Sequence, residues 1–180
     1  MIVGIVLLMP QAWAGGQVSD VLVRDDGRTR GYAHAPITLV EYSDFTCGFC
    51  LKFFRETWPR IREKYIETGK VRFLYRDFPR ALQGPGVEAA VAARCAGDQG
   101  RYWQMHDRMF TNGGRLDEAA FQRHAQAIGL DQPLFVKCLE EAHHTGPIFQ
   151  DRSEGVSLGF RGTPGFVLLR TKGEEREKDP

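Results

Sequence analysis

Cys47 and Cys50 are separated only by Gly48 and Phe49, and this Cys-x-x-Cys spacing is the part of the sequence best suited to chemistry. On the first turn of a helix, two sulfurs at this spacing can close a small disulfide ring or bind one metal ion. A helix N-terminus carries unpaired N–H groups and the positive end of the dipole, which lower the pKa of the first thiol. We therefore expect Cys47 to be a nucleophile and Cys50 a resolving thiol. Half of a zinc site and an inert buried pair are the alternatives.

A strand and a helix must hold this pair in place. The apolar run at residues 37–42 is rich in β-forming side chains and predicts a buried strand. After the pair, large apolar side chains recur at helical spacing and predict an amphipathic helix, which Pro59 should kink. These side chains are Leu51, Phe54, Trp58, Ile61 and Tyr65. Residues 71–75 predict a second strand, and this β-α-β order implies two parallel strands with the cysteines at the carboxyl end of the first.

Glu41 lies inside the first of these predicted strands. A carboxylate in a buried strand is costly unless it is paired or remains protonated, which makes Glu41 a candidate functional acid. The alternative is an edge residue whose carboxylate faces water.

The second half of the chain is dominated by helical periods. Residues 85–160 contain several apolar repeats at helical spacing, separated by glycine-containing breaks. Asp131 is a suitable N-cap for one of these helices, and either Asp117 or Arg115-Leu116 opens the helix before it. A last strand is predicted at residues 165–169. We expect one α/β domain, formed by residues 35–84 and 161–180, with a helical insertion at residues 85–160.

Composition and charge narrow the function classes. The 180 residues, 42% of them hydrophobic, suffice for one core and a subdomain. With 24 basic and 23 acidic residues the formal net charge is +1, and no long basic run occurs. Nothing in this balance favours binding of nucleic acid, so no nucleic-acid partner is expected.

The first residues resemble a targeting segment. An apolar run followed by Ala12-Trp13-Ala14 predicts a signal peptide at residues 1–14, and residues 15–34 then form an N-terminal arm. The run is too short to cross a bilayer, so no stable membrane insertion of the mature chain is expected. Export to the bacterial periplasm or another extracytoplasmic compartment would place the four cysteines in oxidising surroundings.

These elements and motifs together resemble the DsbA-like thiol:disulfide oxidoreductases, whose thioredoxin-like fold carries an inserted helical subdomain. The matching phrases extend from the first predicted strand to the last. They are Ala35-Pro36-Ile37-Thr38, Glu41-Tyr42-Ser43-Asp44-Phe45, Arg76-Asp77-Phe78-Pro79, Gln99-Gly100-Arg101-Tyr102-Trp103 with His106, and Gly162-Thr163-Pro164.

The resemblance implies a role for each matching site residue. Cys47 falls on the exposed nucleophile and Cys50 on the buried second cysteine. Glu41 falls on the buried carboxylate that accepts a proton. Thr163 and Pro164 fall on a cis-proline loop that offers backbone groups to a bound substrate; Phe49, in the motif itself, is the further candidate for substrate binding.

Cys95 and Cys138 lie on the apolar faces of two predicted helices of the insertion. Two buried free thiols are one possibility. The resemblance implies instead a structural disulfide between them, which suits an exported chain and would stabilise it by roughly 2 to 4 kcal/mol.

The sequence also departs from this family. The motif contains Gly48-Phe49 in place of the Pro-His pair of strongly oxidising members, so Cys47 should be less acidic and the pair less oxidising. Together with Thr163 before Pro164, this is closer to isomerase-type members, although the arm is too short for their dimerisation domain. At the other end, the closing strand and helix of the family are incomplete, which suggests a truncated C-terminus.

The expected activity is dithiol/disulfide exchange at Cys47 and Cys50, in either the oxidase or the isomerase direction. Unfolded or partly oxidised exported proteins are the expected substrates, and a membrane redox partner recycles the pair. No cofactor or metal is expected, because Leu51 stands where haem attachment needs a histidine and His143-His144 is typical of a solvated helix end. The alternative is a non-catalytic thioredoxin-fold module that binds peptides and keeps its cysteines as a structural disulfide.

Overall fold

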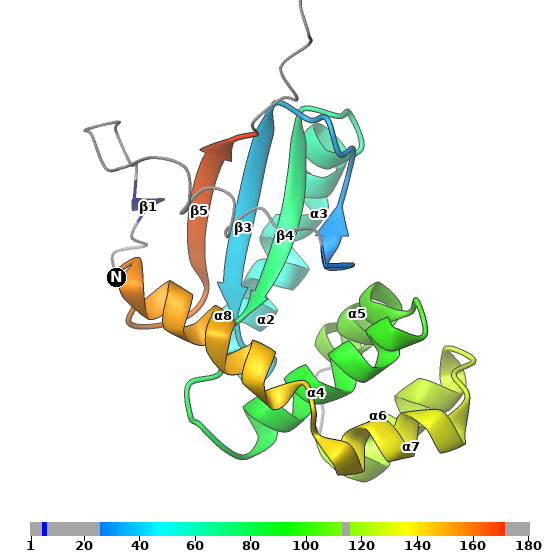
Figure 1. Ribbon diagram of the computed structural model, residues 1–180. Coiled ribbons are helices and arrows are strands. Elements are labelled where there is room, and N and C mark those ends of the chain that lie inside the picture. The colour runs from blue at the N-terminus through cyan, green and yellow to red at the C-terminus, as the bar shows by residue number, and fades with distance from the viewer. Residues whose placement is uncertain (1–4, 7–25, 113–115, 172–180) are drawn as a thin grey trace, which may run out of the picture.

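A computed structural model describes residues 5–6, 26–112 and 116–171 of the chain (Figure 1). Within these ranges a mixed sheet has the strand order β1-β5-β3-β4-β2. The strands are β1 (Ile5–Val6), β2 (Thr29–Arg30), β3 (Ile37–Ser43), β4 (Val71–Asp77) and β5 (Gly165–Arg170). The predicted α/β fold with an inserted helical subdomain is confirmed.

The centre of the sheet is the predicted β-α-β unit. Strands β3 and β4 are parallel, with Glu41 opposite Tyr75. Strand β5 runs antiparallel to β3 on its other side, with Gly165 opposite Tyr42. The carboxyl ends of β3 and β4 and the start of β5 therefore meet at one edge of the sheet, where the cysteine motif begins.

The crossover between β3 and β4 is a continuous helical run with two wider turns. It consists of α2 (Gly48–Lys52), the π-helical segment η1 (Phe53–Thr57), α3 (Trp58–Ile61) and a second π-helical segment, η2 (Arg62–Ile66). The N–H of Trp58 bonds to the carbonyl of Phe53 directly before Pro59. Because proline lacks a donor and crowds the preceding turn, the helix widens ahead of it, which is the local form of the predicted kink.

The remaining helices are α4 (Pro85–Asp98), α5 (Tyr102–Asn112), α6 (Glu118–Ala127), α7 (Gln132–Glu141) and α8 (Thr145–Ser157). Helices α4 to α7 gather at the edge where β3 and β4 end (Figure 1). The predicted N-caps are confirmed, since Asp117 accepts from the N–H of Ala120 and Asp131 from that of Leu134. These caps begin α6 and α7 where the sequence predicts.

Two elements differ from the sequence-based expectation. Part of the N-terminal arm, Thr29–Arg30, forms the edge strand β2 against β4. Two residues are too few to show the alternating pattern of a strand in the sequence. Only their pairing with β4 identifies them as a strand. Helix α8, assigned from the sequence to the insertion, instead crosses one face of the sheet (Figure 1).

The two faces of the sheet carry separate cores. One core lies on the side of the crossover helix and continues into the insertion, with Cys50, Phe73 and Tyr75 among its members. The other lies beneath α8 and includes Val40, Tyr42 and Phe78. Because side chains alternate along a strand, Glu41 points to the face opposite Val40 and Tyr42, which is the face that holds Cys50.

Both ends of the chain extend beyond this description. The predicted signal peptide at residues 1–14 lies outside the described residues except for Ile5–Val6, whose backbone pairs in parallel with β5. Residues 172–180, to which the expectation of a truncated C-terminus applies, also lie outside them. None of the described helices is long and apolar enough to span a membrane.

Candidate active site

Cys47 is the N-cap of α2, and a buried carboxylate shapes the turn that leads to it. Asp44 accepts hydrogen bonds from the backbone N–H and the hydroxyl of Thr46, at 2.8 and 2.7 Å. Its second oxygen accepts from the N–H of Arg80, 2.9 Å away in the loop after β4. A Cβ on Gly86 would lie 3.0 Å from the same carboxylate. Asp44 therefore positions the turn that leads to Cys47. From the sequence it stood out only as part of a phrase shared with the family.

The two thiols of the motif are both free and both buried. Cys50 has no exposed surface and Cys47 exposes 5% of its own, so Cys47 is less accessible than the resemblance implied. The thiol of Cys47 donates to the carbonyl of Thr163, 3.4 Å away. The loop before β5 therefore covers the sulfur from one side.

The environment of Cys47 favours its thiolate. A hydrogen bond from the Cys50 thiol, the side chain of Thr163 and the backbone N–H groups of Cys50 and Phe49 lower the pKa of Cys47 to about 5, against the opposing effect of burial. The last two donors belong to the first turn of the helix. A low pKa is thus reached without a histidine inside the motif.

The pKa values of Cys50 and Glu41 shift in the opposite direction, upward. Burial, the hydrogen bond to Cys47 and the nearby Glu41 raise the pKa of Cys50 far above its ordinary value. Burial also raises the pKa of Glu41 to about 8, although a hydrogen bond with Ser43 opposes the shift. At neutral pH the site therefore holds one thiolate, one neutral thiol and a carboxyl that can still give or take a proton.

The predicted substrate-binding residues lie around the same sulfur. The Thr163–Pro164 peptide bond is cis. Among the described residues, the hydroxyl of Thr163 is buried and has no partner besides the Cys47 sulfur that its side chain faces. Phe49 exposes 56% of its surface on the motif itself. An apolar ring and the edge of a loop thus flank Cys47.

A pocket of about 420 Å³ opens beside Cys47 and was not foreseen from the sequence. Its walls come from the turn before α2, from α2 itself, from the start of α4, from α5 and from the residues just before α6. The apolar residues that line it are Phe45, Leu51, Pro85, Met109, Phe110 and Leu116. Because these residues are distant in sequence, only the docking of the insertion onto the sheet brings them together.

Cys95 and Cys138 lie away from this site and form a disulfide between α4 and α7, with their Cα atoms 5.8 Å apart. The pairing that the resemblance implied is present. The bond joins two residues that are 43 positions apart in the insertion and so restricts the unfolded chain.

A parallel β-α-β unit with a Cys-x-x-Cys at the helix start and a cis-proline loop against the first sulfur defines a thioredoxin-fold redox protein. Comparison with known sequences agrees: a family model described as thioredoxin matches residues 24–178. The chain belongs to the thioredoxin family, and the solved structures and curated relatives below show its similarity to the DsbA-like oxidoreductases.

Solved structures of similar proteins superpose on most of the chain. The chain superposes on α-DsbA1 of Wolbachia pipientis with a TM-score of 0.75 at 29% identity, covering 87% of this chain and 81% of that one. A thioredoxin-like oxidoreductase from Silicibacter pomeroyi gives a TM-score of 0.72 at 28% identity, covering 84% and 90%.

Curated relatives are longer than this chain. A "Putative protein-disulfide oxidoreductase" of Rickettsia conorii is 32% identical over 152 residues, which are 81% of this chain and 54% of the relative. The Na(+)/H(+) antiporter NhaA 3 of Salinispora tropica is 34% identical over 145 residues, 80% of this chain and 22% of the antiporter. The chain thus spans about half of the first relative and about a fifth of the second.

Proposed function

We propose that the chain catalyses thiol–disulfide exchange at Cys47 and Cys50 on exported protein substrates. The observation that carries this proposal is the opposite shift of the two thiols, with the pKa of Cys47 at about 5 and that of Cys50 raised. A structural disulfide needs no such difference, whereas exchange needs one sulfur that attacks and leaves easily and another that waits protonated.

In the oxidising direction, a substrate thiolate attacks the Cys47 sulfur of the Cys47–Cys50 disulfide. A mixed disulfide forms, and the sulfur of Cys50 leaves with the electron pair and takes a proton. Glu41, with its pKa near 8, is the proposed source of that proton. A second thiolate of the substrate then attacks the substrate sulfur of this mixed disulfide, and Cys47 leaves as a thiolate. The substrate has lost two electrons, and the Cys47/Cys50 pair has gained them.

In the isomerase or reductase direction the same steps run backwards. The Cys47 thiolate attacks a wrong substrate disulfide, Glu41 accepts the proton of Cys50, and Cys50 resolves the mixed disulfide. The apolar pocket and the exposed Phe49 favour unfolded protein segments as substrates, since such segments expose apolar side chains. A membrane redox partner in the periplasm or a similar compartment would restore the pair after each cycle.

Insulin reduction tests the assignment of roles. Cys47→Ser should abolish the reduction of insulin by the chain in the presence of excess dithiol, because the attacking sulfur is lost. Cys95→Ser is the matched control, because it removes a cysteine of the other pair. It should lower the stability of the chain but leave the rate of insulin reduction per folded molecule unchanged. Equal loss of activity in both variants would reject the division into catalytic and structural cysteines.

Alkylation of the reduced chain separates an enzyme from the binding-module alternative. The rate of modification of Cys47 by iodoacetamide, followed by mass spectrometry, should rise with a midpoint near pH 5 and be constant above neutral pH. For an ordinary thiol the rate of modification would instead rise with a midpoint at about pH 8.5. Cys50 should remain unmodified in the native chain. If both thiols are equally inert, the catalytic proposal fails and the peptide-binding module is favoured.

A further inference from the structure

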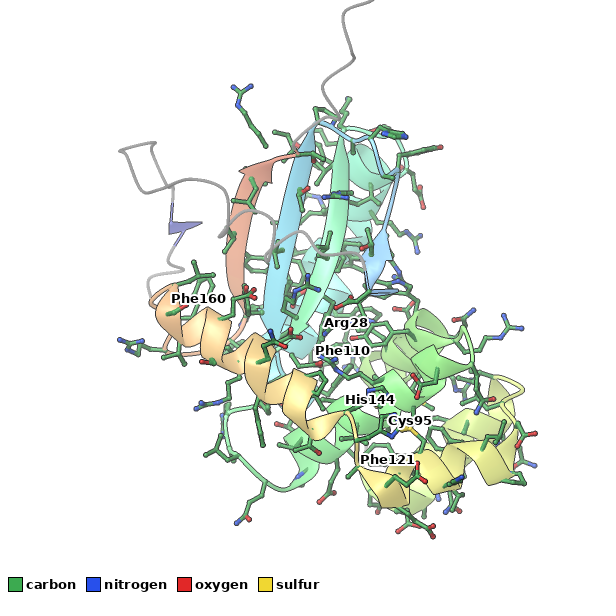
Figure 2. The ribbon with its side chains drawn as sticks, in the orientation of Figure 1. Arg28, Cys95, Phe110, Phe121, His144 and Phe160 are labelled. Atoms are coloured by element: carbon green, nitrogen blue, oxygen red, sulfur yellow. A yellow bond between two sulfur atoms is a disulfide. The ribbon has the colours of Figure 1, made fainter. Side chains whose placement is uncertain are left out.

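A second group of possible metal ligands lies in the insertion, away from Cys47. It comprises Asp98 at the end of α4, Cys138 on α7, and His143 and His144 in the turn before α8. The ligand atoms of all four lie within 4.8 Å of one another. Figure 2 shows His144 and Cys95, the disulfide partner of Cys138, at neighbouring places in this part of the molecule.

One oxygen of Asp98 is the centre of the group. It lies 2.8 Å from Nε2 of His144, 3.5 Å from Nε2 of His143 and 3.5 Å from the sulfur of Cys138. The two imidazole rings lie 4.1 Å apart, centroid to centroid. Two imidazole nitrogens and a carboxylate oxygen that converge in this way are the donors that zinc and similar divalent ions prefer.

The backbone directs the two histidines toward this point. Helix α7 ends at Glu141, and its C-cap, Ala142, is the one non-glycine residue with a positive φ (47°) in the part of the chain that the structure describes. This turn brings the next two residues back beside Cys138. Nε2 of His143 faces Asp98, and its Nδ1 lies 3.8 Å from the carboxylate of Glu141 on the outer side.

We propose that Asp98, His143 and His144 bind a zinc-like divalent ion and that reduction of the Cys95–Cys138 disulfide completes the site with the Cys138 thiolate. A disulfide sulfur is a poor ligand, whereas a thiolate is among the strongest for zinc. A dithiol reductant supplies the two electrons and two protons that convert the disulfide to two thiols, and itself becomes a disulfide. Cys138 then releases its proton as it binds the ion.

Ion binding and reduction are therefore coupled. An ion that binds the reduced form more tightly stabilises that form by mass action, and so makes the disulfide easier to reduce. The insertion would then sense the redox state and the supply of divalent ions together. This coupling is independent of the exchange proposed for Cys47.

Zinc titration tests the proposal in a Cys47→Ser/Cys50→Ser background, which removes the other dithiol that would bind zinc when reduced. Zinc affinity is measured by competition with a chromophoric chelator, before and after reduction with a phosphine. We expect one ion per chain in each state and at least about tenfold tighter binding after reduction, because a thiolate joins the ligand set. Cobalt should show a thiolate-to-metal absorption band only in the reduced chain.

Histidine variants provide the control that does not depend on the disulfide. His143→Ala/His144→Ala should lose zinc binding in both states. Both residues lie in the turn before α8, where the side chain of His143 is half exposed and that of His144 is 16% exposed, and circular dichroism should show that the fold is retained. His34→Ala, which changes an exposed histidine outside the group, should bind zinc as the background does. Affinity that survives the loss of both histidines, or that is equal in the oxidised and reduced chains, would overturn the proposal.

Discussion

Glu41 lies in the middle of a strand, but its titration belongs to the cysteine pair. It is 4% exposed, and its charge raises the pKa of Cys50, while the thiolate of Cys47 contributes to its own raised pKa. A carboxyl held partly neutral in this way costs stability at neutral pH, where the unfolded chain ionises it freely. The raised pKa of Glu41 thus supports the proton transfer that thiol–disulfide exchange requires, and it lowers the stability of the folded chain.

Glu41→Gln should stabilise the reduced chain at pH 7 but not at pH 4. The pKa of Glu41 is about 8 in the folded chain and 4.5 ordinarily, so the native protein loses stability as the pH rises from 4.5 to 8. An amide does not ionise, and the variant should gain roughly 3 kcal/mol at pH 7 in urea unfolding. Glu56→Gln, at an exposed position, is the control and should change little at either pH. An equal gain in stability at both pH values would show that burial does not raise the pKa of this carboxyl.

Helix α8 depends on a single glycine for its approach to the sheet. A Cβ on Gly155 would lie 2.6 Å from the ring of Phe78 and 2.9 Å from that of Tyr42. One turn earlier on the same face, Asp151 accepts from the backbone N–H of Asp77 at 3.1 Å. Close packing and a buried hydrogen bond together hold α8 against β3 and β4, although the sequence alone places it with the insertion.

Gly155→Ala should therefore destabilise the fold by about 1 to 3 kcal/mol, because the added methyl group forces two buried rings to move. Gly146→Ala is the matched control on the same helix, where an added Cβ meets nothing within 4 Å. It should be neutral or stabilising by up to about 1 kcal/mol, since alanine favours the helix. Urea unfolding at one pH compares the two, and similar changes would contradict the close contact.

Across the whole molecule, a buried ion cluster joins the arm, the sheet and the insertion. Arg28 binds Asp77 at 3.0 Å and Asp151 at 2.6 Å, and Arg94 binds the same two carboxylates at 2.7 and 2.8 Å. Figure 2 shows Arg28 where the sheet meets the helices of the insertion. These side chains come from the segment before β2, from β4, α4 and α8, so the cluster holds the insertion in the position that forms the pocket beside Cys47.

Arg28→Met should cost about 3 to 5 kcal/mol of folding free energy, because it leaves buried carboxylates short of a partner. Arg62→Met breaks an exposed pair with Glu67, 3.1 Å apart, and should cost at most about 1 kcal/mol. Thermal unfolding followed by circular dichroism measures both. A small loss at Arg28 would mean that the cluster does not tie the segments together.

The sequence by itself determined the features that depend on neighbours along the chain. Strands β3 and β4, the capped helices α6 and α7 and the Cys47/Cys50 motif follow from periodicity, caps and spacing, which act over a few residues. The family resemblance, carried by short phrases, supplied the cis-proline loop and the Cys95–Cys138 bond.

Only the tertiary structure decided what depends on distant residues. It placed β2 at the edge of the sheet, α8 across one face, and the pocket at the joint between sheet and insertion. It also covered Cys47 with the loop at Thr163, and brought Asp98 to the His143–His144 pair. Burial arises from the packing of segments that lie far apart in the chain, such as Cys47 and Thr163, 116 residues apart, and no local pattern encodes that packing. The low pKa of Cys47 therefore has a local part, from Cys50 and Phe49, and a distant part, from Thr163.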